Sequence, residues 1–147
     1  MDKYESINNL FVHLFNDILE LEERAVITEE FKDLTNNDMH IIEAIGLGEG
    51  NNMSTIARKL GITVGSLTTS MNSLVNKKYV IRERSETDRR VVNIRLSSKG
   101  VKAYHHHANF HKEMVEAVVA SMPEEEIPVL EKALDGIYKF FKSYKKS

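Results

Sequence analysis

Imidazoles gather in one short stretch of the chain. Four of the six histidines lie between positions 105 and 111, and His40 belongs to an earlier helical segment. His107 and His111 are four residues apart, so a helix places them on one face, a spacing common among zinc ligands. Neutral imidazole suits zinc. Buried histidines that hydrogen-bond to one another are the alternative, and we expect no resident cofactor.

A second group of chemically active side chains is arginine-rich and surrounds a polar turn. Arg84, Arg89 and Arg90 flank or belong to the segment 85–90. An arginine gains from the enhanced negative potential of a narrow minor groove in AT-rich DNA. Asp88 lies two residues before Arg90 and is placed to hold its guanidinium. An ordinary turn salt bridge is the alternative interpretation.

Between these groups lies a helical face of short hydroxyls and amides. Serine and threonine donate to phosphate oxygens, threonine methyl groups contact thymine methyls, and an asparagine reads base edges. The face lacks a central arginine for guanine, which favours an AT-rich target. Together with the turn, it gives a predicted DNA-binding set: Ser54, Thr55, Ser66, Thr68, Thr69, Asn72, Lys77, Arg84, Asp88, Arg89 and Arg90.

The elements that carry these residues follow from periodicity. A helix starting near Thr35 ends at the glycines of 46–50; a short helix from Ser54 then ends at Gly61, and another runs from about Thr63 to Lys78. Two short helices joined by a tight glycine turn form a helix-turn-helix. Residues 80–84 and 91–96 alternate like strands around a polar tip, which predicts a β-hairpin. The buried stripe of the second helix is predicted to be Val64, Leu67, Met71 and Leu74.

The flanking segments are long amphipathic helices. The first carries a broad apolar band, and the segments from 98 to 120 and from about 123 onward repeat apolar residues at heptad steps. Such bands need more partners than one small chain offers. We therefore predict a mainly α fold with a small β-hairpin wing, in which residues 1–34 and 98–147 dimerise and residues 35–97 form a winged helix-turn-helix.

Charge and composition agree with this interpretation. The chain has 147 residues and a net charge of −2, yet residues 54–102 hold 11 Lys+Arg against 3 Asp+Glu, a net charge of +8. A block this basic indicates an anionic partner. The sequence has no cysteine, no nucleophile elbow, no Walker motif and no HExxH, so we expect no enzyme activity. It has no long apolar run or leader, so we expect a cytoplasmic protein with no membrane partner.

The chain resembles the MarR family of transcriptional regulators over nearly its whole length. The resemblance is carried by residues 54–61 and 64–79, the wing sequence 84–90 and the Leu96-Ser97-Ser98-Lys99-Gly100 segment. It implies a homodimer that binds a double-stranded DNA palindrome. It also implies that Asp88 orients an Arg90 inserted into the minor groove, with Arg89 on a phosphate.

A narrower resemblance is to the fatty-acid-biosynthesis repressor (FabT-like) branch. It is carried by residues 37–40, 68–72, 88–92 and 110–116. It implies a repressor of type II fatty acid biosynthesis genes whose DNA affinity is modulated by long-chain acyl-acyl carrier protein. An effector pocket is then expected among Leu10, Phe11, Leu14, Phe15, Ile18, His40, Phe110 and Met114, although plain dimer core is the favoured interpretation for each apolar member taken singly.

Two alternatives stay open. A zinc-responsive branch of the same family uses one histidine on the second helix and two on the fifth, and His40, His107 and His111 match those positions. That branch would offer a glutamate where this chain has Met39, so Asp38 or Glu43 would have to substitute. The other alternative is a MarR regulator of a different small-molecule response.

Overall fold

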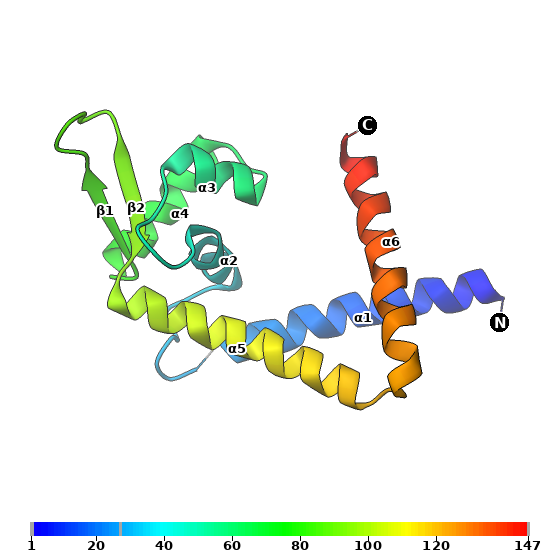
Figure 1. Cartoon of the computed structure of the whole chain (residues 1–147). Helices are drawn as coiled ribbons and strands as arrows, with labels where there is room; N and C mark the ends of the chain where they lie inside the picture. The colour runs from blue at the N-terminus through cyan, green and yellow to red at the C-terminus, as the bar shows by residue number, and fades with distance from the viewer. Residues whose placement is uncertain (1, 27, 147) are drawn as a thin grey trace. The chain divides into compact units, whose positions relative to one another are not determined.

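The computed structural model describes residues 2–26 and 28–146 (Figure 1). Within these residues the elements follow in the order α1 (Lys3–Val26), α2 (Asn36–Ile45), α3 (Met53–Leu60), α4 (Val64–Asn76), β1 (Val80–Arg84), β2 (Val92–Leu96), α5 (Ser98–Ala120), a 3-10 turn (Glu124–Glu126) and α6 (Ile127–Lys146). The mainly α winged helix fold predicted from the sequence is confirmed. The chain forms two compact units, residues 1–110 and 111–147.

The core of the first unit lies between α2, α3, α4 and the hairpin. Leu67, Met71 and Leu74 of α4 have no exposed surface, as the sequence predicts. The prediction is wrong for Val64, the fourth member of this stripe, because it is 43% exposed. It is the first residue of α4 and lies beyond the side chains that cover the rest of the stripe.

Local hydrogen bonds explain where the helices begin. The hydroxyl of Thr35 accepts from the Asp38 backbone N–H, and the Asp38 carboxylate accepts from the Thr35 N–H, which is a complete capping box for α2. Ser97 caps α5 through its hydroxyl, which accepts from Gly100 N–H. The α3 cap is Asn52, so this helix begins one residue earlier than predicted.

Gly61 ends α3 as predicted, at φ 69° and ψ 31°. Only glycine adopts this left-handed conformation at no steric cost. The next helix end is different, because Lys78 has a φ of 73° although it is not glycine. This left-handed residue turns the chain into β1, and α4 itself ends at Asn76, two residues earlier than the sequence predicted.

The hairpin pairs β1 with β2 in antiparallel register, with Val80 opposite Leu96 and Arg84 opposite Val92. Asn51 forms a bridge to Ile94, which ties the base of the hairpin to the segment before α3. Gly50 makes this approach possible, since a Cβ there would meet the Ile94 carbonyl oxygen at 2.3 Å. The wing is therefore anchored at its base.

The flanking helices leave large apolar side chains in solvent within this single chain. On α1, the exposed fractions include 40% for Ile18 and 65% for Phe15. On α6, described by itself, Leu134, Phe141 and Tyr144 are exposed by more than half. Residues 124–126, which the sequence analysis includes in the last helical segment, form a separate 3-10 turn before α6. No helix among the described residues has the length and apolar character needed to cross a membrane.

Candidate nucleic-acid interface

The outward face of α4 offers hydroxyl and amide groups to solvent. Ser66, Thr68, Thr69 and Asn72 are all exposed. The Thr63 hydroxyl donates to Ser66 Oγ at 3.0 Å, which leaves the proton of Ser66 for another acceptor. Thr68 instead donates its hydroxyl to the Val64 carbonyl at 2.8 Å, so its methyl group is the part that remains to contact a base.

The start of α3 carries the other two hydroxyls of the predicted set. Ser54 is exposed and Thr55 is half-buried. The Asn52 side chain already accepts from the Thr55 N–H at 2.8 Å. Phosphates bind favourably near helix N-termini because unpaired N–H groups and the helix dipole face them. These two residues therefore lie where a DNA backbone contact is chemically reasonable.

The tip of the wing holds Arg90 in a fixed orientation. Asp88 Oδ1 accepts from both the backbone N–H and Nε of Arg90 at 3.1 Å, and Oδ2 accepts from Nη2 at 3.3 Å. These bonds hold the pKa of Asp88 below its usual value, so the carboxylate stays ionised. The Arg90 side chain is 92% exposed. The aspartate thus orients a guanidinium that no protein surface covers.

The two faces of the hairpin differ in charge. One face of the hairpin is continuous with the core and carries Val80, Arg82 and Arg84. Directly paired residues share a face, and Val80 and Arg82 are paired with the buried Leu96 and Ile94. On the opposite face, Arg95 donates to Glu83 at 2.9 Å and lowers the pKa of that carboxyl. Positive charge without an acidic partner among the described residues is thereby concentrated on the face nearest α4.

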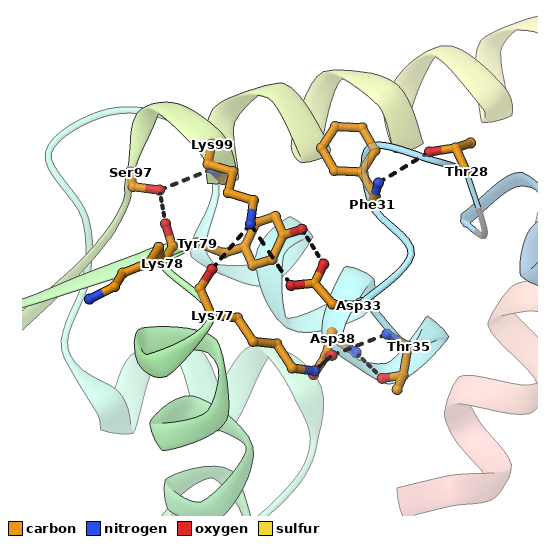
Figure 2. A network of polar contacts seen from close by, with 11 residues as sticks. Thr28, Phe31, Asp33, Thr35, Asp38, Lys77, Lys78, Tyr79, Ser97 and Lys99 are labelled. Carbon is orange, nitrogen blue, oxygen red and sulfur yellow. Dashed lines mark hydrogen bonds and ion pairs between the residues drawn. The ribbon is translucent and has the colours of Figure 1, made fainter.

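Lys77 is engaged within the protein. Its Nζ donates to Asp38 Oδ2 at 3.0 Å, and only 28% of the lysine side chain and 7% of the aspartate side chain are exposed (Figure 2). The sequence predicts Lys77 as a DNA contact, but its ammonium group is directed to α2. The pair instead fastens the end of α4 to the capping box of α2.

A polar cluster joins Tyr79 to two further segments, the one that carries Asp33 and the start of α5 (Figure 2). The Tyr79 hydroxyl donates to Asp33, and Lys99 Nζ lies 4.2 Å from the centre of the tyrosine ring. Burial raises the pKa of Tyr79, and its hydrogen bond to Asp33 raises it further. Partial burial raises the pKa of Asp33, but the bond from Tyr79 and the charge of Lys99 outweigh it and lower the pKa overall.

The histidine cluster of the first unit contains a carboxylate that sequence reasoning missed. Glu22 is 5% exposed, and its Oε1 lies 3.0 Å from His40 Nε2 and 3.4 Å from His107 Nε2. Glu43 Oε2 is 3.4 Å from the same nitrogen of His107. Glu22 follows Ile18 by four residues and precedes the buried Val26 by four, so helical periodicity was the signal that pointed inward. His111 lies one turn beyond His107 on α5, in the second unit.

The predicted effector residues are distributed over several elements. The α1 members Leu10, Phe11, Leu14, Phe15 and Ile18 are exposed, and Phe110 is half-buried. Met114 belongs to the second unit and is half-buried there. His40 lines an open groove of about 370 Å³ between α2 and α3, together with Glu43, Ala44, Lys59 and Leu60.

Comparisons with known proteins agree with this geometry. Residues 32–91 match the model of the MarR family. FabT of Streptococcus pneumoniae, solved in complex with DNA, is 39% identical, with 97% of this chain and 99% of that chain covered and a TM-score of 0.90. The chain belongs to the MarR family. It is a DNA-binding transcriptional regulator of the winged helix type, and family and fold are those of such regulators rather than of enzymes.

Two further similar proteins are more distant. The regulator SarZ of Staphylococcus saprophyticus is 35% identical over 68 residues, which are 46% of this chain, and the match spans about half of that regulator, 47% of its length. The MepR–DNA complex of Staphylococcus aureus is 23% identical at a TM-score of 0.67, with 88% of this chain and 96% of that chain covered. The second likeness shows the fold alone.

Proposed function

We propose that the chain represses genes of type II fatty acid biosynthesis. The observation that carries the proposal is the 39% identity to FabT of Streptococcus pneumoniae over nearly the whole of both chains. The orientation of Arg90 by Asp88 and the exposed polar face of α4 support operator binding by residues 35–97. The proposed contact set is Ser54, Thr55, Ser66, Thr68, Thr69, Asn72, Arg84, Asp88, Arg89 and Arg90, with Lys77 left out because of its bond to Asp38.

In this proposal α4 lies in the major groove and the wing reaches the adjacent minor groove. Small hydroxyl and methyl groups on α4 fit thymine-containing sequences, and Arg90 fits a narrow, AT-rich minor groove. Arg89, which is exposed, is the proposed contact to a phosphate. The expected operator is therefore AT-rich where the wing touches it.

We also propose that two copies of the chain form the working unit. The exposed apolar band of α1 and the exposed apolar residues of α6 would otherwise face water. In this proposal the apolar side chains of one copy cover those of the other, so residues 1–34 and 98–147 form the dimer interface. Two winged helices about one DNA turn apart then match a palindrome.

Sedimentation of the purified chain tests whether it is a dimer. The Leu14→Glu variant should be monomeric and should bind operator weakly.

The proposed effector is long-chain acyl-acyl carrier protein, acting as a corepressor. The apolar side chains of α1, with Phe110 and Met114, offer the chemistry that an acyl chain needs. Binding between the dimerisation helices and the winged helix would change the spacing of the two α4 helices. A coupling free energy of about 1–3 kcal/mol is typical of such regulation.

A gel shift on the promoter of a type II fatty acid synthesis operon tests the proposal. Long-chain acyl-acyl carrier protein should tighten the complex, whereas unacylated carrier protein should leave it unchanged. Zinc at micromolar concentration should also leave it unchanged. Release of the DNA on adding the acylated carrier protein would reverse the effector logic, and failure to bind this promoter would remove the fatty acid assignment.

A second candidate function, regulation by zinc, is favoured by one observation. Buried Glu22 supplies the carboxylate that the sequence seemed to lack beside His40 and His107. Each separation, 3.0 Å from Glu22 Oε1 to His40 Nε2 and 3.4 Å to His107 Nε2, is short enough for that pair of atoms to bind one ion with metal–ligand bonds of about 2.0–2.1 Å. Imidazole and carboxylate groups are donors that zinc accepts.

The two candidate functions are separated by the same gel shift. If zinc controls the protein, a chelator should reverse a zinc-dependent change in operator affinity, and Glu22→Gln should abolish that change. Glu23→Gln is the matched control, because Glu23 is the next residue of α1 but is exposed. If neither zinc nor chelator changes the affinity for the operator, Glu22 is only a buried hydrogen-bond partner of the histidines.

A further inference from the structure

One arginine outside the predicted contact set reaches from the wing to α4. Arg82, in β1, donates from Nη2 to the Asn72 side-chain oxygen at 2.8 Å. Both side chains reach the surface there, and Asn72 belongs to the outward face of α4. The bond therefore ties the recognition helix to the first strand of the wing at the surface.

The register explains why Arg82 is directed to this side. Arg82 is opposite Ile94, whose side chain is fully buried, so the two lie on the face of the hairpin that is continuous with the core. Its neighbours Ile81 and Glu83 lie on the other face. At Arg82 the core has ended, and the side chain continues alongside α4.

The charge of Arg82 has no acidic partner in the part of the chain that is described. Arg95 pairs with Glu83 at 2.9 Å and Arg90 with Asp88 at 3.1 Å, whereas the bond that the structure gives Arg82 is to a neutral amide. Arginine presents five N–H donors in a fork suited to phosphate. A bond to Asn72 limits the motion of this fork and leaves its other donors for another acceptor.

The geometry of DNA then identifies that acceptor, on the docking arrangement proposed above. With α4 in the major groove and the wing in the neighbouring minor groove, the sugar-phosphate strand that separates the two grooves crosses the junction of α4 and β1. We infer that Arg82 binds a backbone phosphate at this crossing and that Asn72 is the positioning residue that holds it. The phosphate contact fixes the register of the helix and the wing on the duplex together.

This inference changes the role expected of Asn72. Bidentate recognition of adenine requires the side-chain oxygen of asparagine as an acceptor, in addition to its amide N–H. In the structure that oxygen accepts from Arg82. Asn72 is therefore assigned to orienting a phosphate ligand, and base selectivity falls to the other exposed residues of α4.

Equilibrium binding over a series of salt concentrations tests the inference. The probes are the fatty-acid-operon promoter duplex and a mixed-sequence duplex, and the proteins are wild type, Arg82→Ala, Asn72→Ala and the double variant. Arg82→Ala should weaken binding to both duplexes and lower the slope of log affinity against log salt by about 0.9 for each phosphate that the variant no longer binds. Arg82→Lys should keep the slope, because the point charge remains.

Arg95→Ala is the matched control. It removes an arginine from the same hairpin, but one that faces away from α4 and is paired with Glu83, so the slope should not change. Asn72→Ala should weaken binding, and the double variant should be no weaker than Arg82→Ala alone. Thermal unfolding of every variant ensures that folded proteins are compared.

Three results would overturn the inference. The first is an unchanged salt slope in Arg82→Ala. The second is a weakening confined to one base pair of the promoter, because that marks a base contact, and the third is full additivity of the Asn72 and Arg82 substitutions. Arg90→Ala separates this failure from failure of the docking arrangement itself. If Arg90→Ala weakens binding and Arg82→Ala does not, only the phosphate assignment fails; if neither matters, the placement of helix and wing fails.

Discussion

The hydroxyl of Tyr79 lies 2.6 Å from the carboxylate of Asp33, although 46 positions separate the two residues in the chain. Tyr79 leads into β1, Asp33 belongs to the segment between α1 and α2, and Lys99 of α5 lies over the tyrosine ring. This contact therefore connects the start of the wing with two elements outside the DNA-binding helices. The hydrogen bond between Tyr79 and Asp33 therefore helps to hold the start of the wing against those elements.

Tyr79→Phe should lower the free energy of unfolding by about 1 kcal/mol near neutral pH, since it removes one hydrogen bond to a charged group that is partly in solvent. The bond helps to hold the pKa of Asp33 below 3.8 in the folded state. Its contribution is therefore present above that value and disappears as the pH falls through the lower folded-state pKa. Urea unfolding at neutral and at acidic pH checks this, and an equal difference between the proteins at both would contradict it.

Lys77→Met should destabilise the fold and leave DNA binding by the folded protein electrostatically unchanged. It strands the buried Asp38 carboxylate, at a cost of about 2 kcal/mol, less than for a fully buried pair because Lys77 is 28% exposed. Because its ammonium group is committed to Asp38, the salt slope of DNA binding should match that of wild type. A shallower slope would return Lys77 to the set of phosphate contacts.

Gly100→Ala and Gly136→Ala should change stability in opposite directions. A Cβ at Gly100 would meet the Tyr79 carbonyl oxygen at 2.1 Å, so alanine must displace the start of α5, at about 1–3 kcal/mol. At Gly136, on α6, nothing among the described residues lies within 4 Å, and alanine should stabilise the helix by about 1 kcal/mol. Denaturant midpoints of the two variants measure both effects. Similar midpoints for the two variants would show that the start of α5 moves to accept a Cβ at position 100 at little cost in stability.

Lys78→Gly should stabilise the protein. The left-handed φ of 73° is costly for a residue with a Cβ, by about 1–2 kcal/mol, and the greater freedom of glycine in the unfolded chain offsets about 0.5–1 kcal/mol of that gain. The expected net gain is roughly 0.5–1 kcal/mol. The backbone carbonyl of Lys78, which accepts from the Ser97 hydroxyl at 2.6 Å, is kept. Lys78→Val, which adds branching at the same φ, should lower the melting temperature instead.

Asp88→Asn should weaken operator binding less than Arg90→Ala does. The asparagine keeps one acceptor for the Arg90 backbone but removes the charge that binds the guanidinium, whereas alanine removes the guanidinium itself. Removing a groove interaction of this kind costs roughly tenfold in affinity or more. Glu86→Gln, also a tip carboxylate, is the control for charge alone. If Glu86→Gln changes operator binding as much as Asp88→Asn does, the effect of Asp88 is one of charge and not of orienting Arg90.

Sequence reasoning succeeded where a local rule decides the structure. The start of α2 near Thr35, the turn at Gly61 and the start of α5 at Ser98 each depend on residues within a few positions of one another. It failed where distant segments meet. The commitment of Lys77 to Asp38 spans 39 positions, and the approach of Glu22 to His107 joins α1 to α5. No periodicity within one helix contains that information.

The site followed the same rule. Asp88 and Arg90 are two residues apart, so their pairing was predictable, whereas Arg82 meets Asn72 only through the hairpin register. The faces of α1 were recognised as apolar, but which molecule covers them depends on a partner that one chain does not contain.

The hydrogen bonds of wing-tip residues 85–91 are all made within the segment 84–91 in the structure described, whereas the base of the hairpin is bonded to Asn51. The tip is therefore a self-contained segment of the structure. Substitutions within it should change the DNA contacts while leaving the hydrogen bonds of the rest of the polypeptide in place. New promoter preferences are therefore accessible by exchanging this one short segment, with folding left to the remainder of the protein.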